Sequence, residues 1–147
     1  MTMAKECQVD FYVLQDESQS AEKLACRLAL MAWEQGNRSQ MLAEDDAEAE
    51  RLDKLMWEYP PGRFLPHARV EHEPSAPVVI ATGQLTGAGS PDVVINLTRR
   101  AIPDPENFRR LLEVVPASAA QRQASRDKFR AYRDQGLEPA HHPIKHG

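Results

Sequence analysis

Short runs of apolar residues alternate along this chain with longer segments in which apolar residues recur at helical spacing. The short runs are rich in β-branched and aromatic side chains and are bounded by glycine, proline or polar residues, which is typical of buried strands. They predict strands at 9–14, 39–43, 78–81 and 93–97, with a last fragment at 113–115. Residues 63–75 lack such a pattern and predict a loop with at most a short strand near Val70.

The first two helices are predicted by their end signals as well as by their periodicity. Ser20 is a candidate N-cap for a helix that runs to about Gln35, and Gly36 follows where a left-handed residue is favoured. Asp45 or Asp46 can cap a second helix, which the sequence Tyr59-Pro60-Pro61-Gly62 ends.

Two further helices are predicted in the second half of the chain. A short one covers 103–112, and Ser118 is the better cap candidate for a basic helix over 121–133. Strands that alternate with helices predict a single α/β domain over 1–137, a three-layer sandwich with a mostly parallel central sheet. Residues 138–147 show little periodicity and predict a flexible tail.

One connection is too short for the usual parallel crossover. The segment between the strands at 78–81 and 93–97 contains glycines and has no room for a helix, so these strands are not expected to be simple parallel neighbours.

Composition and charge narrow the class of protein. The 147 residues carry a formal net charge of -4, and this balance argues against bulk non-specific binding to nucleic acid, which needs broad neutralisation of phosphates. No apolar run approaches the length of a membrane span, and the N-terminus lacks a signal-peptide pattern. Cys7 and Cys26 have no metal-type spacing, so a soluble, reduced, cytoplasmic protein is expected.

The loops that follow the first two strands carry acids where a phosphate site needs glycines. Asp16 and Glu17 occupy the first loop, and Glu44, Asp45, Asp46 and Glu48 occupy the second. Acids in the first turn of a helix also stabilise its dipole, and capping is the favoured interpretation. A divalent-metal site built from Asp16, Glu44 and Asp45 stays open, although the spacing does not require it.

Other candidate chemistry is weak. Gly83, Gly87 and Gly89 do not form a dinucleotide fingerprint and are interpreted as turn residues. His67 and His72 have no identifiable partner in the sequence, while His141, His142 and His146 could bind only adventitious metal. The sequence therefore predicts no catalytic residue, no metal site and no cofactor.

Two features point to protein partners instead. Trp57, Tyr59 and Phe64 crowd a helix end and the turn after it, where they either close one edge of the core or form a contact surface.

The second feature is the basic helix. Arg122, Arg126, Phe129 and Arg133 fall on one stripe at about 100° per residue, and Arg130 flanks them. Small residues on the other side (Ala117, Ala120, Ala124 and Ala131, with Tyr132 at the margin) are expected to pack on the domain. The basic stripe is either a solvated face or a docking site for an acidic segment with an apolar end.

These features together resemble the chi subunit family of the bacterial DNA polymerase III holoenzyme. The resemblance extends over nearly the whole chain, in the segments FYVL, MAWEQGNR, EAERLDKLMWEYPPGRFLPH, VVINL, VVP and RDKFRAYRDQG. It implies a Rossmann-like α/β fold and a non-catalytic accessory subunit in DNA replication.

The resemblance also implies two partners. Trp57 and Phe64 match the family's contact positions for the psi subunit of the clamp loader, a surface that some members use for a helicase-like protein. The positions that match the pocket for the acidic C-terminal tail of single-stranded-DNA-binding protein are Val115, Arg122, Arg126, Phe129 and Arg130.

The chain departs from the family pattern at the tail site. Arg122 and Arg130 stand where lysine is expected, and Phe129 where tyrosine is expected, so tail binding should survive without the tyrosine hydroxyl. A small nucleotide-dependent enzyme of Rossmann type and a direct binder of single-stranded DNA are the alternatives. The second lacks the stacking platforms that such proteins use.

Overall fold

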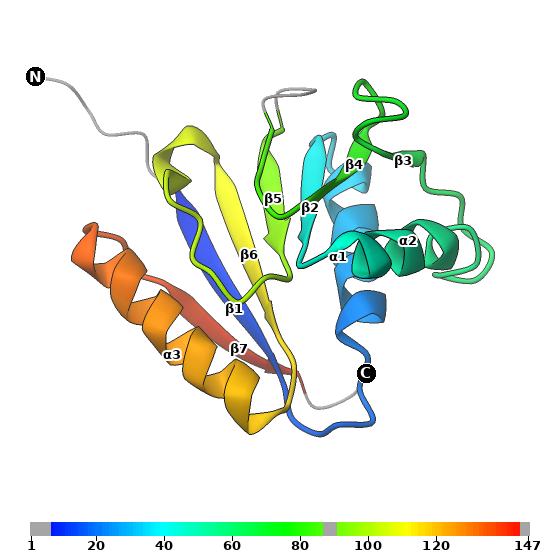
Figure 1. Cartoon of the computed structure of the whole chain (residues 1–147). Helices are drawn as coiled ribbons and strands as arrows, with labels where there is room; N and C mark the ends of the chain where they lie inside the picture. Colours follow the sequence, from blue (N-terminus) through cyan, green and yellow to red (C-terminus); the bar gives the residue numbers. More distant parts are fainter. Residues whose placement is uncertain (1–6, 87–90, 145–147) are drawn as a thin grey trace, which may run out of the picture.

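The computed structural model describes residues 7–86 and 91–144, which form a three-layer α/β sandwich (Figure 1). Within these residues one seven-stranded sheet has the strand order β3-β4-β2-β5-β6-β1-β7, and all pairings are parallel. The strands are β1 (Gln8–Leu14), β2 (Ser39–Ala43), β3 (His67–Arg69), β4 (Val78–Thr82), β5 (Val93–Asn96), β6 (Arg110–Val115) and β7 (Ala140–Ile144). The helices are α1 (Ala21–Glu34), α2 (Asp46–Leu55) and α3 (Ala119–Asp134), with a 3-10 turn η1 (Pro105–Asn107).

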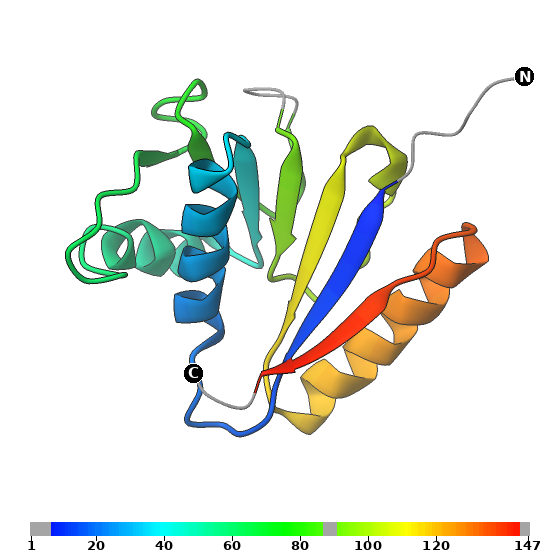
Figure 2. The same cartoon turned by 180° about the vertical axis from the view of Figure 1, so that it is seen from behind.

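The helices divide between the two faces of the sheet, which confirms the predicted Rossmann-like class. Helices α1 and α2 cover one face, and α3 lies across β1, β6 and β7 on the other, as the two views show (Figures 1 and 2). No helix of the described residues is both long enough and apolar enough to cross a membrane.

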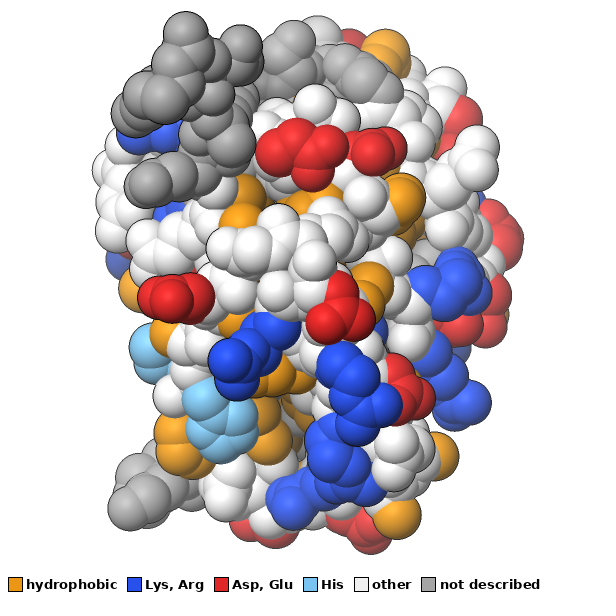
Figure 3. Space-filling view, turned by 90° about the vertical axis from the view of Figure 1, so that its left-hand side faces the viewer, with side chains coloured by type: hydrophobic (Ala, Val, Ile, Leu, Met, Phe, Trp, Pro, Cys, Tyr) orange, Lys and Arg blue, Asp and Glu red, His pale blue; other side chains and the backbone are white. Residues whose placement is uncertain are grey.

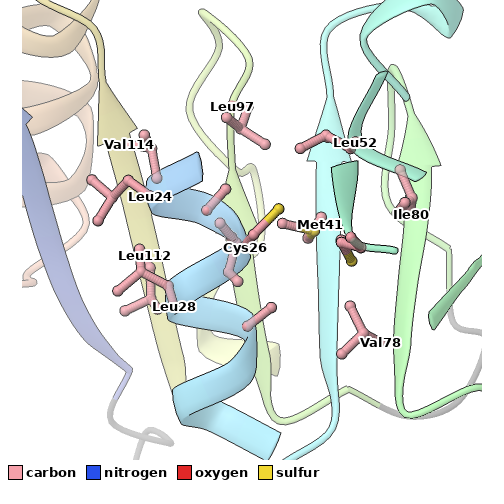
Figure 4. Packing of buried hydrophobic residues seen from close by; sticks show 14 of the residues in the cluster. Leu24, Cys26, Leu28, Met41, Leu52, Val78, Ile80, Leu97, Leu112 and Val114 are labelled. Carbon is pink, nitrogen blue, oxygen red and sulfur yellow. The ribbon is translucent and has the colours of Figure 1, made fainter. Parts of the chain in front are cut away.

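The larger part of the core lies between α1, α2 and the sheet. Leu24 and Leu28 of α1 point toward Leu112 and Val114 of β6, while Leu52 of α2 lies over the β2 and β4 end of the sheet (Figure 4). A second cluster on the α3 side contains the residues that alternate along β1, Val9, Phe11 and Val13. Both faces of the central strands are buried, which explains their continuous apolar runs.

The predicted cap residues begin all three helices. The side chains of Ser20, Asp45 and Ser118 accept hydrogen bonds from the backbone N–H groups of Lys23, Glu48 and Gln121 at 3.1, 2.9 and 3.2 Å. Such a cap typically contributes about 1 kcal/mol. Gly36, after α1, has the predicted left-handed conformation with φ of 82°.

Strands β4 and β5 are not neighbours, as predicted, because β2 lies between them and pairs with both. The connection from β4 is fixed to β2 by the buried amide of Gln40. Its Nε2 donates to the Thr86 carbonyl at 3.0 Å, and its Oε1 accepts from the Thr86 N–H at 2.9 Å. Gly83 begins the connection with φ of 78°, while Gly87 and Gly89 lie outside the described residues.

Two predictions are wrong. The helix predicted at 103–112 is only the turn η1, because Arg110–Val115 is the central strand β6, whose Leu111 and Leu112 are buried on opposite faces. The tail predicted at 138–147 contains the strand β7, which pairs with β1 from Asp10↔Ala140 to Leu14↔Ile144. Residues 145–147 lie outside the described residues. The short strand expected near Val70 is β3, which ends just before it.

Candidate protein-binding sites

Helix α3 packs on the sheet through the rings of Phe129 and Tyr132 and through buried polar groups, while the alanines of the predicted stripe are at most partly buried. Ala120 is exposed, whereas Lys128 and Tyr132 are buried. The buried carboxylate of Glu113 on β6 accepts from Lys128 Nζ at 2.6 Å and from the Tyr132 hydroxyl at 2.5 Å. The charge of Lys128 is therefore buried and does not add to the exposed basic stripe of α3.

The same network reaches the loop after β5. Asn96 Nδ2 donates to Glu113 at 2.9 Å, and Lys128 Nζ also donates to the Thr98 carbonyl at 2.9 Å. The Tyr132 hydroxyl accepts from the Ile102 N–H at 2.8 Å. Burial, and the charge and hydrogen bond of Glu113, raise the pKa of Tyr132 far above its ordinary value, so the hydroxyl stays protonated and donates.

A pocket of about 210 Å³ lies between α3 and the strands beneath it. Its apolar floor includes Phe129, whose ring centroid lies 5.4 Å from that of Phe11. The residues that line it are Phe11, Val13, Val115, Arg122, Ser125, Arg126, Phe129 and His141. Seen from the α3 side, hydrophobic atoms lie in a hollow bordered by basic side chains and a histidine (Figure 3).

The pocket brings together four of the five predicted tail-binding residues. Val115, Arg122, Arg126 and Phe129 all line it, although Val115 belongs to β6 and the others to α3. Arg130 does not line it and lies exposed on the next turn of α3.

The charge of the pocket is uniformly positive, since no aspartate or glutamate lines it. Arg126 Nη2 donates to Gln123 Oε1 at 2.7 Å, and Arg122 Nη2 lies 3.5 Å from the Leu14 carbonyl. Both guanidinium groups are without an acidic partner in the hydrogen bonds described, and both lie on exposed residues. They can therefore accept a carboxylate at the surface of an apolar pocket.

Four pocket residues were not predicted from the sequence: Phe11, Val13, Ser125 and His141. Phe11 and Val13 alternate on β1 toward α3, so the period-two pattern of that strand contained their signal. His141 comes from β7, the strand that the sequence did not predict.

The aromatic residues Trp57, Tyr59 and Phe64 lie near β3, at the edge of the sheet opposite β7. The Trp57 and Phe64 side chains are 65% and 64% exposed, and their ring centroids are 6.1 Å apart. Trp57 also makes an edge contact with the His67 ring at 4.9 Å, and His67 Nδ1 lies 2.7 Å from the Leu65 carbonyl, so His67 is held in place. Tyr59 differs from the pair because it is partly buried against the core, with Lys23 Nζ 5.3 Å from its ring centre.

The acidic loop after β2 serves a helix start, as the favoured interpretation had it, whereas in the loop after β1 Asp16 stabilises its own turn and Ser20 caps α1. Asp45 caps α2, and the Glu48 carboxylate accepts from the Glu44 N–H at 2.8 Å. Asp16 accepts from the backbone N–H of Ser18 at 2.8 Å. Among the residues that the structure describes, no group of three or more His, Cys, Asp or Glu side chains is arranged to hold a metal ion.

A larger open groove of about 1030 Å³ lies between the connection after β4 and the segment around η1. Its charged residues are Arg100, Asp92 and Asp104, and Arg100 Nη2 donates to the Gly83 carbonyl at 3.1 Å. The mixture of signs gives this groove no consistent preference for an anion or a cation.

Comparison with solved structures identifies the class of fold. The chain superposes on bacteriophage T4 UvsW with a TM-score of 0.68 at 8% identity, over 97% of this chain and 42% of that one. It superposes on a variant of S. cerevisiae Dbp5 bound to Gle1 and IP6 with a TM-score of 0.61 at 11% identity, over 95% of this chain and 42% of that one. The chain thus spans about two-fifths of those solved chains, and identities this low show a shared Rossmann-like α/β fold alone.

Sequence comparison identifies the family. Residues 7–140 match the model of the DNA polymerase III chi subunit, HolC. The chain is 42% identical over 129 residues to DNA polymerase III subunit chi of Pseudomonas aeruginosa, which covers 87% of this chain and 90% of the relative. It is 30% identical to the subunit of Escherichia coli, over 86% of this chain and 91% of that relative. It is also 30% identical to the subunit of Haemophilus influenzae, over 91% of this chain and 94% of that relative. This chain belongs to the chi subunit family, the replication accessory subunits of DNA polymerase III.

Proposed function

We propose that this protein is a cytoplasmic, non-catalytic bridge that connects the psi subunit of the clamp loader to the acidic C-terminal tail of single-stranded-DNA-binding protein. The observation that carries the proposal is the basic, apolar-floored pocket between α3 and the sheet. It contains two arginines and no carboxylate, which matches a partner with acidic residues and an apolar end.

Binding begins with electrostatic capture and ends with anchoring. Arg122 and Arg126 attract the carboxylates of a flexible tail, and the terminal apolar side chain then enters the pocket beside Phe129 and Val115. At about 210 Å³ the pocket is smaller than the roughly 300–1,000 Å³ of small-molecule sites, and its size suits a single side chain. We assign the carboxylates earlier in the tail to Arg130, which lies exposed one turn further along α3.

The psi subunit is assigned to the surface formed by Trp57 and Phe64. Two large aromatic side chains that are about two-thirds exposed and lie side by side form the kind of apolar anchor that dominates protein interfaces. A helicase-like protein is a further candidate for the same surface, and the two partners would then compete.

The tail site is tested by titrating the protein with a synthetic acidic peptide that ends in an apolar residue. An Arg122→Ala, Arg126→Ala double variant should lose roughly 5- to 30-fold in affinity, the equivalent of about 1–2 kcal/mol. Arg133→Ala is the matched control, because Arg133 is exposed on the same helix and does not line the pocket. Unchanged binding by the double variant, or by a peptide that lacks its last residue, contradicts the assignment.

The psi site is tested by co-purification. Trp57→Ala should abolish co-purification with psi while peptide affinity stays unchanged, and retained co-purification refutes the assignment. A bare single-stranded oligonucleotide should bind far more weakly than the peptide. Comparable binding would favour the direct DNA-binding alternative.

A further inference from the structure

His141 stands on the wall of the pocket that faces the arginines. It is paired with Phe11 in the parallel register of β7 and β1, and both line the pocket beneath α3. The neighbouring His142 lies on the other face of the sheet, where it stacks on Tyr12 at 5.0 Å and contacts Asp10 Oδ1 at 2.8 Å. Only the first of the two adjacent histidines is therefore available to a pocket ligand.

We propose that His141 is a specificity-determining residue that contacts the C-terminal α-carboxylate of the bound peptide and makes peptide binding stronger as the pH falls from 8 to 6. The inference rests on the proposed docking of an acidic tail in this pocket. It adds a residue from β7 to a site whose other residues belong to α3, β6 and β1, and it adds a dependence on pH.

The residues around His141 favour a contact with an anion of the ligand. The charged groups that line the pocket with it are Arg122 and Arg126 of α3, while β1 and β6 contribute only Phe11, Val13 and Val115. With no acid in the lining, the anion that the imidazole can meet is one brought by the ligand. Once the apolar end of a peptide lies on Phe129, its α-carboxylate lies at the mouth of the pocket, between the arginines and His141.

The pH dependence has one source within this site. Arginine stays charged throughout, and the carboxylates of a peptide, with ordinary pKa values near 4, stay ionised between pH 6 and 8. Histidine is the side chain that gains a proton in this range, and a bound carboxylate stabilises the protonated imidazole. Peptide binding and proton uptake are therefore linked.

The test is a titration at pH 6, 7 and 8 and constant ionic strength, with the acidic peptide in a free-carboxylate form and a C-terminally amidated form. The wild-type protein should bind the free-carboxylate peptide about two- to fivefold more tightly at pH 6 than at pH 8, the range expected for one exposed charge pair. The dependence should vanish in His141→Asn and His141→Gln, and also with the amidated peptide. His72→Asn is the control, because His72 is an exposed histidine remote from this pocket in sequence and absent from its lining, and it should keep the dependence.

The outcomes separate this inference from the proposed function. Peptide binding that is independent of pH, or a dependence that persists in both His141 variants, overturns the role of His141 and leaves the docking site in place. A dependence lost in both variants but kept with the amidated peptide overturns the α-carboxylate contact. Failure of the wild-type protein to bind the peptide at any of these pH values overturns both proposals. Thermal unfolding of each variant at the same pH values shows whether β7 is intact.

Discussion

At the scale of single residues, the carboxylate of Glu113 on β6 connects the sheet to α3 through hydrogen bonds. It is completely buried and receives hydrogen bonds from Lys128, Tyr132 and Asn96, so its charge is both paired and solvated by protein donors. Phe129 lies between Lys128 and Tyr132 in the sequence, and the two buried contacts hold its ring against Phe11 in the pocket. The buried network thus positions the surface on which binding depends.

Removal of one partner from this network should be costly. Lys128→Met leaves the Glu113 carboxylate without its cation, and we expect a loss of roughly 3–5 kcal/mol in the free energy of unfolding measured with urea. Arg133→Met removes an exposed cation from the same helix and should change stability by no more than about 0.5 kcal/mol. Equal stabilities of the two variants would show that the Lys128 and Glu113 pair is dispensable.

Cys26 offers a second residue-level prediction. Its side chain is fully buried in α1, and burial, with a smaller contribution from Glu22, raises the pKa of its thiol to about 12. Only the thiolate reacts with alkylating agents, so Cys26 should stay unmodified by iodoacetamide at pH 8 in the folded protein and react when urea is added. Peptide mass mapping measures the modification, and rapid labelling of Cys26 without denaturant would contradict its placement.

At the scale of elements, Asp10 connects the three strands at one end of the sheet. From β1 it pairs with Arg110 of β6 and His142 of β7, both at 2.8 Å. Burial alone raises the pKa of Asp10, but the hydrogen bonds from Arg110, His142 and Gln8 and the charge of Arg110 outweigh burial, and the net shift is downward. The ionised carboxylate is therefore favoured by folding.

The sign of this shift predicts how stability changes in acid. Because the pKa in the folded protein lies below its ordinary value of 3.8, Asp10 stabilises the fold fully above that value. The contribution is lost as the pH falls through the lowered pKa. Asp10→Asn should therefore reduce stability at pH 7 and lose less stability than the wild type between pH 5 and pH 2, as measured by urea unfolding. An identical pH dependence in the two proteins would exclude this role for Asp10.

The same elements show what sequence patterns can and cannot predict. Strands β4 and β5 are predicted to within one residue because a strand buried on both faces is continuously apolar, and the helix starts are predicted because Ser20, Asp45 and Ser118 act through local hydrogen bonds. Strand β7 was missed because an edge strand needs backbone pairing and little apolar periodicity. The sequence predicts the start of β6 as helix because two adjacent leucines suit either a helix or a strand buried on both faces.

Sequence reasoning about the site succeeded within helix α3 and failed for contacts between elements. The basic stripe and Phe129 lie on one helix, so their shared face followed from its period. The burial of Lys128 is not predicted by the sequence, because its partner Glu113 is on β6 and no local signal reports that contact. His141 and Phe11 are brought together by the register of two strands far apart in the chain.

At the scale of the whole molecule, the two proposed binding surfaces lie at opposite ends of the sheet. Trp57 and Phe64 precede the edge strand β3, whereas residues of β1, β6 and the other edge strand β7 line the pocket. Strands β3 and β7 lie on opposite sides of the molecule (Figures 1 and 2). Six strand spacings of about 4.8 Å separate the two edges, or about 29 Å. Two partners of ordinary size can therefore bind at once, as a bridge requires.

This separation predicts that the two binding events are independent. Peptide affinity should be the same within about 0.5 kcal/mol for the free protein and for its complex with psi, because sites this far apart with no shared contacts usually act additively. Raising the salt concentration should weaken peptide binding much more than psi binding. The peptide is attracted by exposed arginines, whereas psi is assigned to an apolar surface. Isothermal titration of the peptide into the free protein and into the psi complex, at low and high salt, measures both effects, with Trp57→Ala as the control that should bind peptide but not psi. A tenfold change in peptide affinity on addition of psi would mean that the central sheet transmits a change between its edges, and the protein would then couple its partners as well as connect them.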